Sequence, residues 1–153
     1  MLIIHKAAEL QKKPKSRKTS LGLVPTMGAL HAGHLSLIER AVEENSSVVV
    51  SIYVNPTQFN RNEDLENYPK NLEEDLEMLK PFSKQLILYV PNHDDLYPEG
   101  IQSKHYDFGS LSQFMEGDAR PGHFDGVATI VEALFQNIKP DKAYFGKKDF
   151  QQL

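Results

Sequence analysis

Two histidines stand three residues apart at a point where an apolar strand pattern passes into a helix pattern. His31 and His34 lie in the segment VPTMGALHAGHLSLI, residues 24–38, with Gly28 before them and Gly33 between them. A helix that begins here would offer unpaired backbone N–H groups and a positive dipole end, which suit phosphate. Two imidazole rings could donate hydrogen bonds to phosphate oxygens and stabilise charge that develops during nucleotidyl transfer. We therefore predict a turn that binds phosphate groups.

Two other interpretations of the histidine pair stay open. Histidines at positions i and i+3 can share a zinc ion, although the chain has no cysteine and no third ligand is evident. The pair could also consist of ordinary loop histidines. The glycines fit the phosphate interpretation, because Gly28 allows a tight turn and Gly33 leaves the backbone open to a bulky group.

The elements that must position this turn follow from the alternation of strand and helix patterns. Short apolar runs predict strands at residues 21–25, 46–54, 85–91 and 142–146. Apolar residues at helical spacing predict helices at residues 4–13, 34–45, 69–82 and 123–140. A loop is predicted at 92–100. The alternation is typical of an α/β fold, here a doubly wound, Rossmann-like parallel sheet with helices on both faces.

Polar residues follow three of the predicted strands. The histidine pair follows the first strand, Asn55 and Gln58 follow the second, and residues 147–152 follow the last. In doubly wound sheets, ligands bind beyond the carboxyl ends of the strands, near a topological switch point. We therefore expect these three clusters to converge on one site.

The composition narrows the class of protein. A chain of 153 residues with a formal net charge of −4 has the size of one domain and no overall preference for nucleic acid or a membrane surface. The absence of cysteine excludes disulfides, thiolate zinc sites and cysteine nucleophiles. The apolar run at the N-terminus is too short for a signal peptide. We expect a cytoplasmic protein.

Several polar side chains are candidates for substrate contacts. Gln58 and Asn55 carry neutral amides that could hold a hydroxy acid, and Asn55 could instead cap the turn that its Asn-Pro pair forms. Arg120 could form a bidentate pair with a carboxylate or phosphate, or a structural ion pair with Glu116.

The segment GKKD, residues 146–149, follows the last predicted strand. Lys148 could offset phosphate charge, and Asp149 could hold a ribose hydroxyl or orient the lysine. A lone KKD is otherwise typical of a solvated surface. Its place after a strand end favours a function.

These motifs occur together in one known family. VPTMGALHAGHLSLI resembles the H-x-G-H signature of the nucleotidyltransferase superfamily. The ordered set PTMGALHAGH, YVNPTQF, YPKNLEEDLEML, EGDARPGHFDGVATIV and FGKKDFQQL resembles the pantoate–β-alanine ligase family over nearly the whole chain. This resemblance implies that pantoate attacks the α-phosphate of Mg-ATP to form pantoyl adenylate and pyrophosphate. β-Alanine then displaces AMP and gives pantothenate.

The resemblance also implies roles for the matched residues. ATP would be held by Met27, Gly28, Ala29, Leu30, His31, Ala32, Gly33, His34, Gly146, Lys147, Lys148 and Asp149. The catalytic residues among these would be His34, His31 and Lys148. Pantoate and β-alanine would contact Gln58, Gln152, Asn55, Arg120 and Tyr68. Mg²⁺ would be bound by Asp75 and Glu74, unless these carboxylates belong to a solvated helix face.

The family chain continues beyond the motifs present here, with a lysine- and serine-rich loop and a C-terminal lid. We therefore expect residues 1–153 to form the N-terminal nucleotide- and pantoate-binding domain, with weak or no turnover of its own. Ala32 stands where the family often has an acidic residue. The family implies a homodimer, to which a bare strand edge at 46–54 could contribute.

Two further function classes stay open. A simple nucleotidyltransferase would share the H-x-G-H segment without needing YVNPTQF or FGKKDFQQL. A nucleotide-binding or dimerisation module without catalysis would fit a chain that lacks the phosphate-closing loop.

Overall fold

The computed structural model describes residues 1–11, 20–56, 71–101 and 123–146. Its strands are β1 (Leu2–Ile4), β2 (Leu21–Thr26), β3 (Ser47–Ile52), β4 (Leu86–Tyr89) and β5 (Lys142–Ala143). Its helices are α1 (Ala7–Gln11), α2 (Ala32–Glu44), α4 (Leu72–Leu79), α5 (His93–Leu96) and α7 (His123–Ile138), and a short 3₁₀ turn at Lys80–Phe82 extends α4. No helix in these ranges is long and apolar enough to cross a bilayer.

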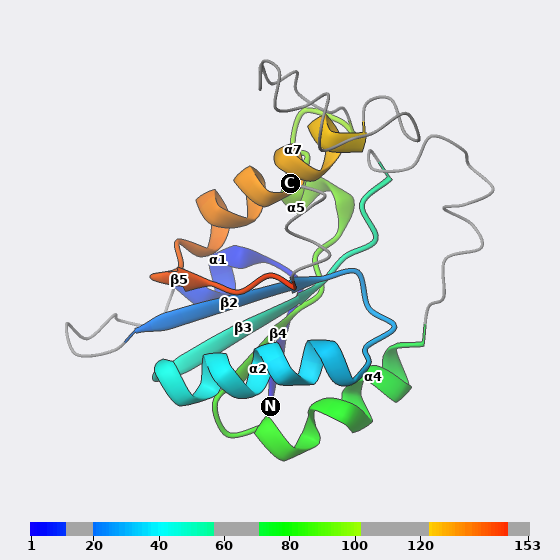
Figure 1. The fold of residues 1–153 in the computed structure, drawn as a ribbon. Helices are drawn as coiled ribbons and strands as arrows, with labels where there is room; N and C mark the ends of the chain where they lie inside the picture. Colours follow the sequence, from blue (N-terminus) through cyan, green and yellow to red (C-terminus); the bar gives the residue numbers. More distant parts are fainter. Residues whose placement is uncertain (12–19, 57–70, 102–122, 147–153) are drawn as a thin grey trace, which may run out of the picture.

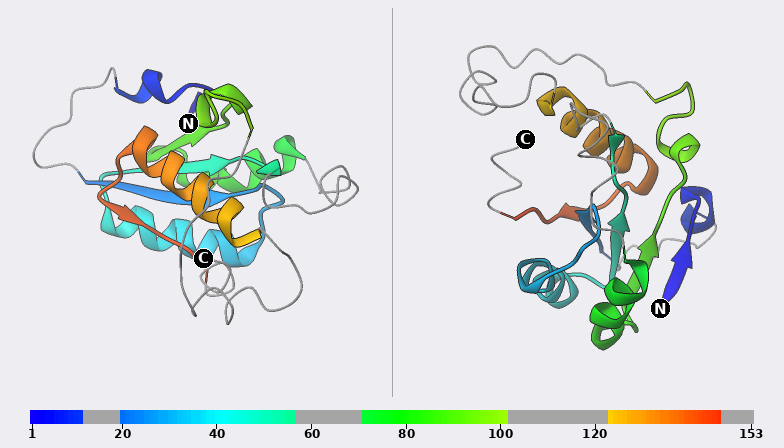
Figure 2. Two further views of the ribbon diagram at one scale, coloured as in Figure 1. Left: turned by 90° about the horizontal axis from the view of Figure 1, so that it is seen from above. Right: turned by 90° about the vertical axis from the view of Figure 1, so that its right-hand side faces the viewer.

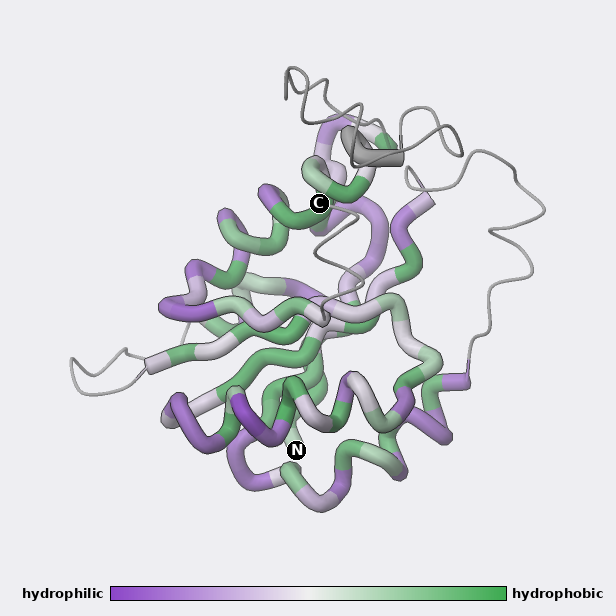
Figure 3. Tube along the Cα trace, viewed as in Figure 1, coloured by the Kyte–Doolittle hydropathy of each residue, from purple (hydrophilic) through white to green (hydrophobic). Residues whose placement is uncertain are grey.

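The strands form one parallel sheet in the order β1-β4-β3-β2-β5. Three consecutive valines in β3, Val48 to Val50, are completely buried, because helices cover the sheet on both sides. Figure 3 shows the resulting apolar centre, with polar residues concentrated on the outer helix surfaces. The predicted α/β fold with a parallel sheet is confirmed.

The helices divide into two layers (Figures 1 and 2). Helices α2 and α4 pack on one face, over a core that includes Val24, Ile38 and Leu79. Helices α1, α5 and α7 pack on the opposite face, over a core that includes Leu23, Tyr89 and Leu134. Each face therefore has its own apolar core, and alternate residues of a strand such as β2 contribute to both.

The layers create a topological switch at β2. The chain crosses from β2 to β3 through α2 on one face, and it reaches β5, on the other side of β2, through α7 on the opposite face. The carboxyl end of β2 therefore lies between those of β3 and β5. This arrangement places the histidine turn where ligands bind in doubly wound sheets.

Three expectations differ from the structure. A helix is predicted from residue 4, but Leu2–Ile4 form the edge strand β1 and the helix begins only at Ala7. The predicted loop at 92–100 contains the four-residue helix α5. Both β1 and α5 are too short to produce a periodic pattern. The segment 46–54 does not offer a bare edge, because β3 pairs with β2 on one side and β4 on the other. Among the described strands, the edges of the sheet are β1 and β5.

Candidate functional site

The chain leaves β2 through a turn whose backbone conformation favours glycine at position 28. Gly28 has a φ of +83°, and Ala29 follows with a φ of +52°, so two consecutive residues lie in the left-handed region. A Cβ atom on Gly28 would lie 3.2 Å from both Asp75 Oδ2 and Ile52 Cγ2. The Gly28 N–H donates to Thr26 Oγ1 at 3.1 Å. The role predicted for Gly28 in a tight turn is therefore confirmed.

The two histidines together cap helix α2. His31 is the N-cap residue, and its Nδ1 accepts the Gly33 N–H at 3.0 Å. His34 is the third helical residue, and its Nδ1 accepts the His31 N–H at 3.1 Å. This reciprocal arrangement is a capping box built from imidazoles instead of the usual hydroxyl and carboxylate groups. The helix therefore begins at Ala32, two residues before the predicted start at His34.

This cap fixes which ring nitrogen carries the proton in the neutral histidines. In His31 and His34 alike, Nδ1 accepts a backbone N–H, so the proton of each neutral ring is on Nε2. The ring centroids are 4.0 Å apart. His31 is exposed and His34 is half-buried. In both rings Nδ1 makes the capping bond, and Nε2–H is the donor group.

The backbone at Gly33 is covered by the His31 ring of this cap and is not open to a ligand. A Cβ atom at Gly33 would lie 2.9 Å from Cε1 and 3.0 Å from Nδ1 of the His31 ring. The space above the glycine is therefore filled by the ring that accepts its N–H. The expectation that a bulky ligand group sits against Gly33 is wrong.

Asp75 bonds the turn from the neighbouring helix α4. Its Oδ2 accepts the Ala29 N–H at 3.1 Å, and its Oδ1 accepts the Leu30 N–H at 2.9 Å. Its side chain is 3% exposed, so the solvated-face interpretation fails for Asp75, whereas Glu74 lies at the surface of the same helix. The described residues contain no group of three potential metal ligands, so within them the alternative of a zinc site at the histidine pair finds no support. The assignment of Asp75 and Glu74 to Mg²⁺ stays a prediction, because Mg²⁺ takes as few as one or two carboxylates.

Most backbone N–H groups of the turn donate hydrogen bonds to acceptors within the protein. Five N–H groups have acceptors within the chain, those of Gly28, Ala29, Leu30, His31 and Gly33. The expectation that the helix start offers these groups to phosphate is therefore wrong for these positions. The Nε2–H groups of the two rings take no part in these backbone bonds.

Asn55 follows β3 as predicted, but its side chain lies inside the protein. Its Nδ2 donates to the Gly126 carbonyl at 2.9 Å, and its Oδ1 accepts a hydrogen bond from the Tyr97 hydroxyl. The residue is completely buried. These bonds tie the end of β3 to α5 and α7, which supports a structural role and not the predicted substrate contact.

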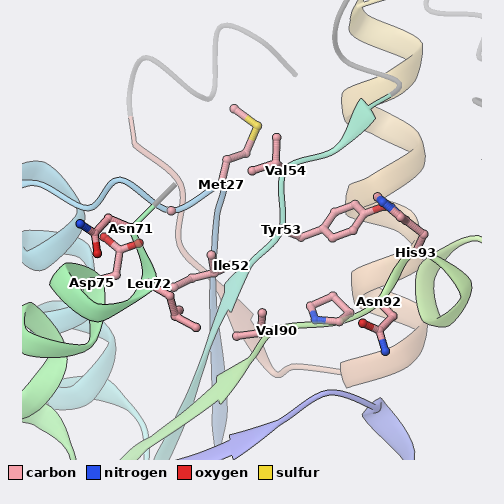
Figure 4. A pocket seen from close by; sticks show the side chains of 12 residues that line it. Met27, Ile52, Tyr53, Val54, Asn71, Leu72, Asp75, Val90, Asn92 and His93 are labelled. Atoms are coloured by element: carbon pink, nitrogen blue, oxygen red, sulfur yellow. The ribbon is translucent and has the colours of Figure 1, made fainter. Parts of the chain in front are cut away.

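A cavity of about 330 Å³ opens beyond the carboxyl ends of β3 and β4. Figure 4 shows Asp75 and Asn71 on one side of it and Tyr53 with His93 on the other, with Met27 between them. The Tyr53 hydroxyl lies 2.6 Å from His93 Nδ1. Burial raises the pKa of Tyr53 far above its usual value. Sequence reasoning missed this pair, because His93 falls in a segment predicted to be a loop.

Gly146 follows β5 and is the last described residue of the predicted ATP site. Seven other predicted site residues lie outside the described residues, namely Gln58, Tyr68, Arg120, Lys147, Lys148, Asp149 and Gln152.

Comparison with known proteins decides the family. A sequence profile of the family described as pantoate-beta-alanine ligase matches residues 2–153. The chain belongs to the pantoate-beta-alanine ligase family. Among relatives of this family, a pantothenate synthetase from Christiangramia forsetii is 53% identical over 93% of the chain, and one from Thermosipho africanus is 48% identical over 99%. The chain spans about half the length of both, 50% and 55%.

Solved structures of pantoate-beta-alanine ligases share the fold. A crystal structure from Francisella tularensis, complexed with "Beta-gamma ATP" and β-alanine, superposes with a TM-score of 0.90 at 40% identity. It is matched over 99% of this chain and 59% of its own. Pantothenate synthetase from Thermus thermophilus gives a TM-score of 0.87 at 46% identity, over 99% of this chain and 54% of its own.

Proposed function

We propose that this chain carries the nucleotide-binding part of an ATP-dependent ligase that joins pantoate to β-alanine. In the proposed reaction, the pantoate carboxylate attacks the α-phosphate of ATP and pyrophosphate leaves. The amine of β-alanine then attacks the acyl carbon of pantoyl adenylate, and AMP leaves with the electron pair of the broken C–O bond. Family membership over residues 2–153 and the ATP complex of the Francisella tularensis relative support this reaction.

The single observation that carries the proposal is the capping box of His31 and His34 at the switch point. Because each Nδ1 is held by a backbone N–H, the two Nε2–H groups are oriented before a nucleotide arrives. Such preorganised donors stabilise negative charge on phosphate oxygens as pyrophosphate departs, at typically about 3 kcal/mol per donor. We assign both histidines to this role, together with Lys148 by family resemblance.

The remaining assignments are also proposals. Gln58, Gln152, Arg120 and Tyr68 are proposed to hold pantoate and β-alanine on family resemblance. Mg²⁺ is proposed to accompany ATP, with Asp75 and Glu74 as the carboxylates that the family resemblance assigns to it, and we derive no step through it. The lack of cysteine supports a cytoplasmic location. A homodimer remains a prediction without structural support from β3.

Stepwise product analysis tests the reaction. The chain, and the longer protein if the sequence is a piece of one, is incubated with ATP, Mg²⁺ and pantoate, and pyrophosphate is measured. β-Alanine is then added, and AMP and pantothenate are measured. The proposal predicts pyrophosphate that depends on pantoate and AMP that depends on β-alanine.

Other outcomes identify the alternatives. Pyrophosphate release without AMP release after β-alanine would indicate a simple nucleotidyltransferase. Nucleotide binding without pyrophosphate release, even in the longer protein, would indicate a binding module. Titration with D-pantoate beside Gln58→Ala tests the substrate assignment, because binding that is unaffected by this substitution would contradict it.

A further inference from the structure

We propose that Asp75 is a positioning residue for the histidine turn. In this proposal, its carboxylate clamps the backbone at Ala29 and Leu30 and thereby sets the direction in which His31 and His34 present their Nε2–H groups. The functional consequence rests on the nucleotide chemistry proposed above. The clamp itself can be tested without a nucleotide.

The geometry of the clamp uses both carboxylate oxygens. Each oxygen accepts one N–H, from Ala29 at 3.1 Å and from Leu30 at 2.9 Å, and these residues lie 46 and 45 positions before Asp75 in the sequence. An amide side chain could satisfy only one of the two N–H groups, because its nitrogen is a donor. The site therefore selects aspartate over asparagine.

The position of Asp75 is an unfavourable one for a carboxylate. The side chain is almost completely buried, and in the part of the chain that the structure describes no lysine, arginine or histidine forms an ion pair with it. Its charge is met instead by two backbone N–H dipoles and by the first turn of α4, whose N-cap is Asn71. A buried charge without a counter-ion is destabilising unless its hydrogen bonds are complete.

The clamped backbone is itself unfavourable without support. Gly28 and Ala29 both have positive φ, and a residue such as Ala29 loses on the order of 1 kcal/mol in this conformation. Asp75 lies on the same side of Gly28 as a Cβ atom would, 3.2 Å from it. The carboxylate therefore holds the strained pair in place, two residues before the N-cap histidine.

The clamp also decides which groups can meet phosphate. By taking the N–H groups of Ala29 and Leu30, Asp75 removes two backbone donors from the ligand and leaves recognition to the imidazoles. Without the clamp, we expect the N–H groups of Ala29 and Leu30 to lose their acceptor. We then expect the two capping histidines to adopt more than one orientation. The expected defect is thus in nucleotide affinity and in the histidine rings, more than in the stability of the fold.

Three variants of the chain test this role. Asp75→Asn keeps one acceptor and should fold, Asp75→Ala removes both, and Glu73→Gln is the matched control at an exposed position of the same helix turn. Amide hydrogen exchange is measured at Ala29 and Leu30, and the ring ¹H–¹⁵N signals of His31 and His34 are recorded without nucleotide. We expect faster exchange and altered ring signals in Asp75→Asn, and neither change in Glu73→Gln.

Nucleotide affinity separates a clamp from a metal ligand. AMP is titrated in EDTA, and ATP is titrated with Mg²⁺, well below the unfolding temperature. We expect Asp75→Asn to weaken both by about tenfold, the effect of about one lost charge-assisted hydrogen bond. A loss confined to Mg-ATP would overturn the proposal in favour of metal binding.

The clamp and the proposed function fail in different ways. If the unaltered chain binds no nucleotide, the proposed function fails, while amide exchange and ring signals still report on the clamp. If exchange at Ala29 and Leu30 and the histidine signals are unchanged in Asp75→Asn, the clamp is wrong whatever the nucleotide affinity.

Discussion

Polar residues gather after β2 and after β4, at the same end of one sheet, yet they are used in opposite ways. After β4, Asp95 accepts the Ala7 N–H at 3.0 Å and a hydrogen bond from the Tyr89 hydroxyl. Asn137 donates to the Asp95 carbonyl at 2.9 Å. These bonds join α1, β4, α5 and α7, so the polar atoms stabilise the fold.

After β2, Nδ1 of each histidine ring accepts a backbone N–H, so Nε2 is the donor nitrogen of each neutral ring. The acceptors Nδ1 of His31 and His34 hold the helix start, and the clamp from Asp75 holds the turn before it. The bonds after β4 join distant elements of the fold, whereas the bonds after β2 fix the orientation of ring donors at a turn, as a preorganised site for negative charge requires. Position at the sheet edge alone does not distinguish the two.

The largest expected effect is on the network after β4. Asp95→Ala removes the acceptor of a backbone N–H and of a buried hydroxyl, and should lower the free energy of unfolding by about 2–4 kcal/mol. Urea denaturation measures this loss. The exposed neighbour provides the control, since Asp94→Ala should change it by less than about 0.5 kcal/mol. A loss below about 1 kcal/mol for Asp95→Ala would show that the network does not hold the elements together.

Substitutions in the turn after β2 should affect nucleotide affinity more than the free energy of unfolding. His34→Ala should lower nucleotide affinity by tenfold or more, on the order of 1.4 kcal/mol, because it removes the hydrogen bond to phosphate that we propose for this ring. The free energy of unfolding should fall by only about 1 kcal/mol, the effect of a weakened cap. Calorimetry and urea denaturation measure the two quantities, with His5→Ala as a histidine control away from the turn. Equal affinity with a large loss of stability would mark His34 as structural.

Alkaline pH should expose the buried tyrosines. Burial raises the pKa of Tyr89, whose hydroxyl also bonds Asp95, and burial likewise raises the pKa of Tyr53. Both stay neutral in the folded protein while the unfolded chain ionises above about pH 10. Stability should therefore be constant below that pH and then fall, by up to about 1.4 kcal/mol per pH unit for each tyrosine.

Chemical denaturation at a series of pH values, from mildly to strongly alkaline, measures this dependence. In Tyr53→Phe the free energy of unfolding should fall less steeply with pH, because the contribution of one tyrosine is removed. A flat profile, or the same slope in Tyr53→Phe, would contradict the burial of these hydroxyls as the cause.

The smallest expected effect on stability comes from Gly33→Ala. Alanine favours a helix by about 1 kcal/mol, but its Cβ would collide with the His31 ring and break a cap bond of similar value. The free energy of unfolding should therefore change little, while nucleotide affinity falls because the ring turns away. Ala32→Gly, at the neighbouring helix position, is the control for backbone flexibility. Retained affinity in Gly33→Ala would show that the ring orientation does not matter.

The sequence was sufficient for the parts of the fold that are long or strongly apolar. The valine run of β3 and the helical spacing in α2 and α7 carry enough periodicity to be identified, and their alternation leads directly to a parallel sheet. The three-residue β1 and four-residue α5 carry too little, because their stability comes from pairing and packing with distant elements.

The site was predictable in position but not in detail. His31 and His34 were found from their spacing after a strand. Their capping role was not, because imidazole is an uncommon N-cap and the preferred caps are serine, threonine, aspartate and asparagine. The hydrogen-bond partners of Asp75 lie 45 and 46 residues away in sequence, and those of Asn55 lie 42 and 71 residues away, so no local pattern connects them.

The most direct test of the account is the ring nitrogen spectrum of His31 and His34 during titration with AMP and ATP. We predict that each ring, when neutral, carries its proton on Nε2 in the free protein, and that the Nε2 signals shift on binding while the amides of Ala29 and Leu30 do not. A neutral ring with its proton on Nδ1, or nucleotide-induced shifts at those two amides with unmoved Nε2 signals, would contradict this.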